Sequence, residues 1–340
     1  MDTLRIAILG SGYMGGSYAE CIARYNTRVQ LTAIAGGTRA PALAARYGVA
    51  YEPEYSALLA RDDVDAVLIA TPHDGHRDQA LAAARAGKHV LIEKPMATSV
   101  RACDEMIAAF AAAGVVLEVI KTLRFRGSIA RALRLIAEGA IGRVRAISGR
   151  SLFIGTGIED KHWTMDADQG GMLLDMGCHN FDILCALAGV APRRIYSTVT
   201  TYEGPPYLRR NAMTQINFDG DVTAQMWMSY EFPSPGLPDN AHRYLVVGEH
   251  GMLDIDGYGK LRIGAGESWE DVWQQPPIDY INRPLDPVRL EAFYTQTQLF
   301  VDDVLDGRTP AVSGADGRRA VAMVEAAWQS SQTGQSVALS

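Results

Sequence analysis

Cysteines, long apolar runs and clusters of basic residues are scarce or missing in this sequence of 340 residues. Its four cysteines show no CxxC spacing, so we expect reduced, mostly buried thiols in place of a zinc knuckle or a disulfide framework. The formal net charge is −7 and the basic residues are dispersed, so a nucleic-acid partner is not expected. No apolar run is long enough to cross a bilayer or to form a signal peptide, and we expect a cytoplasmic protein without a membrane partner.

The length and composition of the chain predict a folded protein of two domains. A chain of 340 residues exceeds what one hydrophobic core usually organises. Hydrophobic residues make up 48% and charged residues 21% of the chain, and such values are typical of a globular protein and not of a disordered one.

Apolar runs alternate with alanine-rich helical patterns in the first third of the chain. The predicted strands are Leu4–Leu9, Val29–Ala35, Val64–Ala70, His89–Glu93 and Val115–Ile120. Continuously apolar strands separated by helices indicate βαβ units and a parallel sheet that is covered on both faces. We therefore predict an α/β fold in which residues 1–122 form a doubly wound, dinucleotide-binding Rossmann domain.

The pattern changes after about Leu123. One helical stretch, Ile129–Glu138, precedes a series of short strands separated by Gly, Pro and Asp, which indicates antiparallel pairing. These strands are Val144–Arg150, Ile195–Tyr202, Met213–Phe218, Val222–Tyr230, Tyr244–Val247, Met252–Ile255 and Lys260–Ile263. Two helices, Leu290–Asp306 and Gly317–Gln332, close the chain. We predict that residues 123–340 form an α+β domain for substrate binding and oligomerisation, with a large open, predominantly antiparallel sheet.

The first predicted strand runs directly into a glycine-rich turn, Gly10-Ser11-Gly12-Tyr13-Met14-Gly15, which a helical pattern follows. In such a turn Gly10 permits the tight bend, Gly12 lets the backbone approach a pyrophosphate, and Gly15 lets the helix pack closely on the strand. The helix N-terminus then faces the phosphates. A lone motif of this kind is weak evidence, but its place at the start of a βαβ series favours a dinucleotide site that includes Tyr13 and Met14.

Cofactor choice is set at the end of the second strand, where NAD enzymes usually place an acidic residue on the ribose 2′-hydroxyl. This chain has Gly37-Thr38-Arg39 there and no acid. Arg39 could bind a 2′-phosphate through charge-assisted hydrogen bonds, which favours NADP over NAD. Alternatively, Arg39 is a solvated residue that opens the next helix.

Lys94 follows a strand that ends at Glu93, at the carboxyl edge of the predicted sheet, where doubly wound folds bind their ligands. An ammonium group at this edge could donate to a substrate hydroxyl and stabilise alkoxide character. The alternative is a surface lysine that pairs with Glu93.

Asp175, His179 and Asp182 form a polar stripe on an apolar helical segment that Gly170 opens. Asp175 and His179 are four residues apart, so they share one face of the helix. Burying such groups is costly unless they are paired or used, and we therefore expect them to face a cleft. Spacing alone leaves three interpretations open: a histidine general base oriented by an aspartate, a metal site, or structural pairing.

Taken together, these residues resemble the glucose-fructose oxidoreductase, inositol dehydrogenase and rhizopine-catabolism (Gfo/Idh/MocA) family. The resemblance covers nearly the whole chain and rests on these segments in order: Gly10–Gly15, Val64–Val67 with Thr71, Pro72 and His76, Gly87–Pro95, and Gly170–Asp182. It implies that the substrate sits between the second domain and the nicotinamide, and that no metal is needed. The implied cofactor contacts beyond the glycine-rich turn and Arg39 are Thr71, Pro72, His76, Glu93 and Lys94, with His76 positioning backbone.

The resemblance also implies a mechanism. Lys94, Asp175 and His179 fall on the catalytic positions of the family and would contact the substrate. His179 would remove the hydroxyl proton as the nicotinamide accepts hydride, Lys94 would steady the developing negative charge, and Asp175 would orient the histidine.

One departure from many relatives is a basic stretch at the start of the second domain, with Lys121, Arg124 and Arg126. It allows an acidic group on the substrate, bound by Lys121 and Arg124; alternatively, these side chains contact the cofactor or pair with Glu118. Trp163 could stack on a sugar face. Its loop also holds Lys161, His162 and Asp168.

The expected function is an NAD(P)-dependent oxidoreductase that transfers hydride between nicotinamide and a secondary hydroxyl or ketone of a sugar, sugar derivative or cyclitol. One alternative is glycoside cleavage through transient oxidation and elimination, with tightly held NAD and no net redox change. A non-catalytic dinucleotide or sugar sensor is less favoured, because Lys94, Asp175 and His179 are all present. Open sheets of this kind commonly pair face to face, so a homodimer or homotetramer is expected.

Overall fold

The structure is a computed structural model that describes residues 2–154, 170–237, 241–279 and 282–339. The chain divides into two compact units, the first made of Met1–Thr122 with Ile278–Arg318 and the second of Leu123–Pro277 with Arg319–Ser340. The sequence-based division placed all of residues 123–340 in the second domain. Ile278–Arg318 corrects that division, because this segment returns to the first unit and completes its core.

Six strands among the described residues of the first unit form a parallel sheet in the order β3-β2-β1-β4-β5-β6. They are β1 (Leu4–Leu9), β2 (Val29–Ala35), β3 (Ala50–Glu52), β4 (Ala66–Ile69), β5 (His89–Ile92) and β6 (Leu117–Val119). The predicted doubly wound parallel sheet is thus confirmed. The strand order reverses between β1 and β4, which is the switch point at which open α/β sheets bind ligands.

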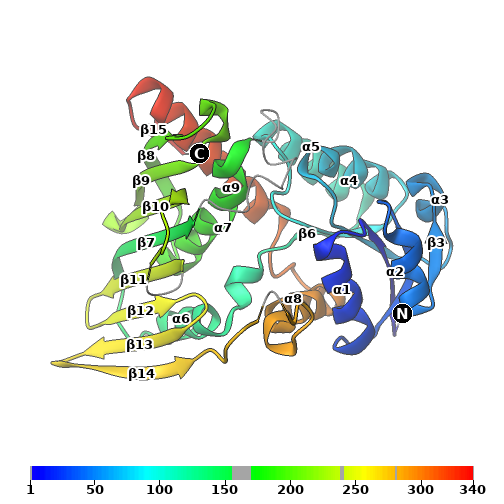
Figure 1. Cartoon of the computed structure of the whole chain (residues 1–340), viewed down its shortest axis with the longest axis horizontal. Coiled ribbons are helices and arrows are strands. Elements are labelled where there is room, and N and C mark those ends of the chain that lie inside the picture. Colours follow the sequence, from blue (N-terminus) through cyan, green and yellow to red (C-terminus); the bar gives the residue numbers. More distant parts are fainter. Residues whose placement is uncertain (1, 155–169, 238–240, 280–281, 340) are drawn as a thin grey trace. The chain divides into compact units, whose positions relative to one another are not determined.

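Helices connect these strands. They are α1 (Tyr13–Arg24), α2 (Ala40–Tyr47), α3 (Tyr55–Leu59), η1 (His73–Gly75), α4 (His76–Arg85), α5 (Val100–Ala113) and, after the chain returns, α8 (Pro287–Asp306). The side chain of Asp286 caps α8 by accepting from the Val288 N–H, and Pro287 suits the first helical position. α8 packs against α1 (Figure 1), and its Phe293 and Phe300 join the core beneath β1.

Nine strands among the described residues of the second unit form one sheet in the order β14-β13-β12-β11-β7-β10-β9-β8-β15. They are β7 (Val144–Ile154), β8 (Pro192–Thr200), β9 (Asn211–Phe218), β10 (Thr223–Phe232), β11 (His242–Gly248), β12 (Met252–Asp256), β13 (Lys260–Ala265), β14 (Ser268–Gln274) and β15 (Val337–Ala338). Among the described strands of this sheet only β7 and β10 pair in parallel, so the prediction of a predominantly antiparallel sheet is confirmed. The sequence did not predict β14 and β15.

The two faces of this sheet differ. The helices of this part of the chain are η2 (Thr122–Phe125), α6 (Gly127–Ala137), α7 (Gly171–Ala188), η5 (Pro206–Leu208), η6 (Asp219–Asp221) and α9 (Gly314–Thr333). α7 packs across β7, β9 and β10 on one face, and α6 packs on β12 and β13 (Figure 1). Alternate residues of β10 are buried under α7 or exposed on the opposite face, as the alternation in its sequence predicts.

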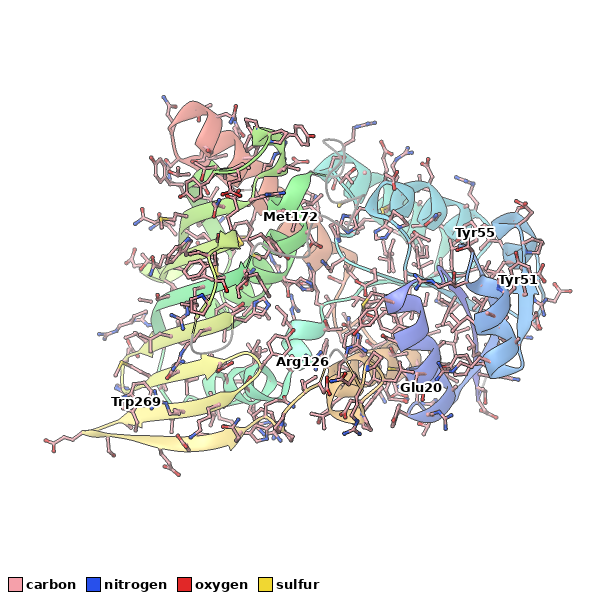
Figure 2. The ribbon with its side chains drawn as sticks, in the orientation of Figure 1. Glu20, Tyr51, Tyr55, Arg126, Met172 and Trp269 are labelled. Carbon is pink, nitrogen blue, oxygen red and sulfur yellow. The ribbon has the colours of Figure 1, made fainter. Side chains whose placement is uncertain are left out.

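The opposite face, which we call the open face, carries exposed apolar side chains. They are Tyr196, Met213, Trp227, Leu245 and Trp269. These side chains line a concavity of about 670 Å³. Trp269 lies on the edge strand β14 (Figure 2). Among the residues described, no helix is long and apolar enough to span a membrane.

Candidate active site

Two close backbone approaches shape the turn between β1 and α1. Gly10 has φ +112°, and a Cβ there would lie 2.3 Å from the carbonyl oxygen of Ala70. A Cβ on Gly15 would lie 1.9 Å from the carbonyl oxygen of Gly10. Both positions therefore require glycine, as predicted for a helix that begins tightly against the first strand.

Gly12 lies at the start of α1 and has more room. A Cβ there would meet nothing closer than Arg39 Nη2, at 3.7 Å. No described side chain caps α1, so its first N–H groups can donate to a phosphate. The protein itself thus leaves space at Gly12, and the turn with the start of α1 fits the pyrophosphate of a dinucleotide.

Tyr13 and Met14 follow this turn. Tyr13 is 51% exposed, and the guanidinium carbon of Arg289 lies 4.5 Å from its ring centre. Met14 packs against the core of the first unit. Of the two predicted cofactor contacts, Tyr13 therefore lies at the surface of the turn, whereas Met14 contributes packing.

Gly37, Thr38 and Arg39 follow β2 and are exposed. The short distance between Arg39 Nη2 and the Gly12 position brings the guanidinium to the phosphate turn. The segment from residue 36 to 39 contains no acidic residue. A cation without an acid at this place suits a 2′-phosphate better than a free 2′-hydroxyl.

His76 joins the loops that follow β4 and β5. It is fully buried, with Nδ1 2.8 Å from the carbonyl oxygen of Pro95 and Nε2 3.0 Å from that of Thr71. Burial lowers the pKa of His76, while the two carbonyl contacts oppose that effect. The ring therefore bridges the backbone segments that contain Pro72 and Lys94.

Glu93 and Lys94 directly follow β5, which ends at Ile92. The Glu93 carboxylate accepts from the Tyr18 hydroxyl at 2.8 Å and from the Lys94 backbone N–H at 3.0 Å. Burial, followed by the charge of Glu93, raises the pKa of Tyr18, so the phenol keeps its proton and donates it. Glu93 thereby ties α1 to the residue that carries the candidate catalytic ammonium group. Lys94 itself is partly buried.

The second unit contributes Asp175 and His179, both on α7. The helix begins just after Gly170, and a Cβ on Gly171 would lie 2.5 Å from the Tyr207 carbonyl oxygen. Met172, in its first turn, is labelled in Figure 2. Asp175 is 5% exposed, whereas His179 is partly exposed. The four-residue spacing puts both on one face of α7, as predicted.

The hydroxyl of Tyr230 donates to Asp175 Oδ2 at 3.3 Å. Burial raises the pKa of Tyr230 well above its usual value, and the charge of Asp175 raises it further. Sequence reasoning missed Tyr230. The available indication was a polar aromatic residue at the end of an alternating strand, and this indication does not identify a partner 55 residues away.

Asp182 has a structural role. It is 2% exposed and accepts two hydrogen bonds from Arg124, from Nε at 2.7 Å and from Nη2 at 2.6 Å. The predicted cleft-facing position is wrong for Asp182, because a bidentate arginine satisfies the buried carboxylate. An acidic substrate group would have to compete with Asp182 for Arg124.

The remaining candidates are Lys121, Arg126 and Trp163. Lys121 is 1% exposed, and its backbone N–H donates to Gln296 Oε1 at 2.8 Å. Arg126, just before α6 (Figure 2), is 4% exposed and has its guanidinium carbon 5.2 Å from the centre of the Tyr258 ring. Trp163 lies outside the described residues, and so does the rest of its loop, Lys161, His162 and Asp168. Across the part of the chain that the structure describes, no cluster of three or more His, Cys, Asp or Glu side chains could hold a metal ion.

Comparisons with known proteins cover both units. Residues 4–121 match the family model described as oxidoreductase family, NAD-binding Rossmann fold, and residues 134–339 match the model described as oxidoreductase family, C-terminal alpha/beta domain. The chain is 30% identical to 1,5-anhydro-D-fructose reductase of Ensifer adhaerens over 82% of this chain and 80% of the relative. It is 29% identical to D-xylose 1-dehydrogenase (NADP(+)) 2 of Haloferax volcanii over 88% of this chain and 89% of the relative.

A solved structure agrees. The aldose-aldose oxidoreductase from Caulobacter crescentus, complexed with glycerol, superposes with a TM-score of 0.85 at 27% identity. The match covers 99% of this chain and all of that one. The likeness therefore extends over both units and is not confined to the dinucleotide fold.

Proposed function

This chain belongs to the Gfo/Idh/MocA oxidoreductase family, and from that membership we propose a specific activity. The enzyme transfers hydride between NAD(P) and a secondary hydroxyl or ketone carbon of a sugar, sugar derivative or cyclitol. The proposal rests on one observation in each unit: the open phosphate turn at Gly12 in the first, and Asp175 and His179 on one face of α7 in the second. The reductase and dehydrogenase relatives named above support the substrate class.

The residues of the first unit fit a dinucleotide. The uncapped start of α1 would hold the pyrophosphate, and the loops tied together by His76 would present Thr71, Pro72 and Lys94 to the rest of the cofactor. When bound, NAD(P) supplies the nicotinamide ring that accepts or returns the hydride.

The protein side chains handle the proton and the charge on oxygen. His179 takes the proton of the substrate hydroxyl during oxidation and returns it during reduction, because a histidine can hold a proton reversibly near neutral pH. Lys94 donates a hydrogen bond to the same oxygen and stabilises its negative character. Asp175, one helical turn before His179, orients the imidazole.

The preferred cofactor is NADP. Arg39 lies at the phosphate turn, and the segment beside it has no acidic residue to accept from a 2′-hydroxyl. The NADP-dependent xylose dehydrogenase among the relatives supports this choice. The substrate is neutral, since Arg124 is already occupied by Asp182.

The test is to follow reduced-nicotinamide absorbance while the purified protein receives NAD or NADP with a panel of sugars, cyclitols and uronic acids. We expect net reduction with one neutral polyol. His179→Ala should lower turnover by about 10² to 10⁴. His250→Ala, which changes an exposed histidine, should leave turnover unchanged. Unchanged turnover in His179→Ala would overturn the role of His179. Aglycone release without net reduction would overturn the hydride-transfer proposal and favour the internally balanced cleavage reaction.

We further propose that the enzyme is a homodimer or homotetramer that forms through the open face and works in the cytoplasm. The exposed apolar side chains on five strands of that face support self-association. All four cysteines are buried, which suits a reducing compartment. Burial raises the pKa of Cys21 and of Cys185 to about 12, so these thiols are poor nucleophiles. Cell fractionation tests the location.

A further inference from the structure

We infer that Tyr230 is a positioning residue for the catalytic helix, which holds Asp175 through its hydroxyl and so governs how that carboxylate acts on His179. The inference rests on the proposed function, because it adds a residue to the same site. It concerns a side chain of the sheet, whereas Asp175 and His179 both come from α7.

The contact is a hydrogen bond with a defined direction. Tyr230 donates to Asp175 Oδ2 at 3.3 Å, and burial together with the charge of Asp175 raises the pKa of the phenol. A phenol that keeps its proton through the working pH range remains a donor. A donor held on a carboxylate oxygen favours the ionised carboxylate.

An irregularity in β10 begins at Tyr230. Ser229 pairs with Leu152 of β7, but the next pair along the strands is Phe232 with Ile154. Two residues of β10, Tyr230 and Glu231, thus oppose the single residue between Leu152 and Ile154, which makes a β-bulge. Bulges re-aim side chains and are common beside active sites.

The consequence of the bulge is visible in the side chains. Trp227 and Phe232 are five residues apart and would point to opposite faces of a regular strand. Their rings nevertheless touch, with centres 5.7 Å apart. Tyr230 has the same parity as the buried Met226 and Met228, so regular alternation already turns it toward α7. The bulge changes the side of Phe232, which returns to the open face beside Trp227.

Packing and a backbone hydrogen bond fix the orientation of the Tyr230 ring. It stacks on Phe153 of β7, with ring centres 5.2 Å apart and planes inclined by 17°. The rings of His242 and Phe153 meet edge to face, with their centres 5.2 Å apart. The Tyr230 backbone N–H donates to the Arg210 carbonyl oxygen at 2.9 Å. A hydroxyl on a ring that cannot swing imposes one orientation on its acceptor.

The titratable groups that face Tyr230 are few among the described residues. They are Asp175 on α7, Tyr258 after β12 and, across Phe153, His242 on β11. Burial lowers the pKa of His242 to about 4, so His242 stays neutral where the enzyme works. A change in the acid limb of activity after removal of the hydroxyl can then be assigned to Asp175 and the His179 on which it acts, and not to His242.

The first experiment compares Tyr230→Phe with Tyr47→Phe. Both changes remove a phenol that donates to a carboxylate and keep the ring, but the acceptor of Tyr47 is Glu20, at 2.6 Å, away from the site. In Tyr230→Phe we expect kcat to fall about tenfold, dinucleotide Kd to stay unchanged, and the acid limb of kcat/KM to move to higher pH. Tyr47→Phe should leave all three unchanged. An unmoved acid limb in Tyr230→Phe overturns the inference.

Two further measurements distinguish loss of the Tyr230 contact from misfolding and from failure of the proposed function. Fluorotyrosine at position 230 keeps the contact with a stronger donor and should move the acid limb to lower pH. The ¹³C resonance of the Asp175 carboxyl, assigned with Asp175→Asn, should titrate at higher pH in Tyr230→Phe than in the parent, whether or not any substrate turns over. A shifted resonance without hydride transfer would reject the proposed function alone, and an unshifted resonance would reject the role of Tyr230.

Discussion

Arg124 and Asp182 form a bidentate ion pair in which the carboxylate side chain is 2% and the guanidinium side chain 15% exposed. The pair joins η2, at the start of the second unit, to the middle of α7. Removing one member leaves the other charge buried without its partner, whereas removing both members leaves no charge behind.

We predict that Asp182→Ala lowers the free energy of unfolding of the second unit by about 3 kcal/mol. The double variant Arg124→Met, Asp182→Leu should recover most of that loss. Urea unfolding followed by tryptophan fluorescence makes the measurement, because the described tryptophans, Trp227, Trp269, Trp273 and Trp328, belong to the second unit. A loss below about 1 kcal/mol in the single variant would contradict the buried-pair argument.

Gly12 and Gly16 offer a matched pair of substitutions. We predict that Gly12→Ala folds normally, because a Cβ there would meet only Arg39 Nη2 at 3.7 Å, but raises dinucleotide Kd at least about tenfold by blocking the approach of the pyrophosphate. Gly16→Ala meets nothing within 4 Å and should leave Kd unchanged. Calorimetric titration with NADP measures the Kd of each variant. Equal affinity in the two variants would show that the turn does not contact the cofactor.

Arg39 should control the choice between the two cofactors. We predict that Arg39→Ala lowers the ratio of kcat/KM for NADP to kcat/KM for NAD about tenfold or more, since a charge-assisted contact with the 2′-phosphate is lost. Arg46→Ala changes a nearby exposed arginine that pairs with Glu20 and serves as the control. The prediction fails when both variants keep the ratio of the parent.

His242 should make the stability of the second unit depend on pH. Burial lowers its folded pKa to about 4 from an unfolded value near 6.5, so the unfolded chain binds the proton first as pH falls. The contribution is constant above about pH 6.5 and is lost progressively between about pH 6.5 and 4, up to about 3 kcal/mol. Tryptophan-detected urea midpoints should lose this slope in His242→Gln and keep it in His250→Gln.

The open face should hold copies of the chain together. We predict that light scattering finds the parent as a dimer or tetramer and finds Met213→Glu, Trp227→Glu as a monomer, because two charges would be buried in the interface. Tyr51→Glu alters an exposed aromatic side chain of the first unit and should not change the mass (Figure 2). A monomeric parent would end the proposal of self-association.

The sequence predicts five of the six described strands of the first sheet, because each is rich in buried apolar residues. The three-residue strand β3 is only partly buried and was not predicted. The sequence did not predict β14, because Ser268–Gln274 is an edge strand exposed on both faces. Such a strand has no buried face that would impose hydrophobic alternation on its sequence. α8 was predicted as a helix but assigned to the wrong unit. The apolar residues Leu290, Phe293 and Phe300 show that it packs on a core, but their spacing does not say which core.

The candidate site divides in the same way. Short spacing along one helix places Asp175 and His179 together, and the glycines of the first turn follow from a strand that runs into a helix. The partners of Asp182 and Asp175 come from Arg124 and Tyr230, 58 and 55 residues away. Such pairings depend on how the strands are ordered in the sheet, and a single sequence does not contain that order.

The return of residues 278–318 to the first unit has a consequence for synthesis. Phe293 and Phe300 fill the core around β1, yet they leave the ribosome almost three hundred residues after it. At 5 to 20 residues per second, roughly 10 to 40 s separate the emergence of Thr122 from that of Arg318. Throughout that interval the nascent dinucleotide-binding unit lacks part of its core, and the chain of the large sheet up to β14 emerges before the missing segment does. This enzyme therefore offers a chaperone an exposed N-terminal core for most of its translation.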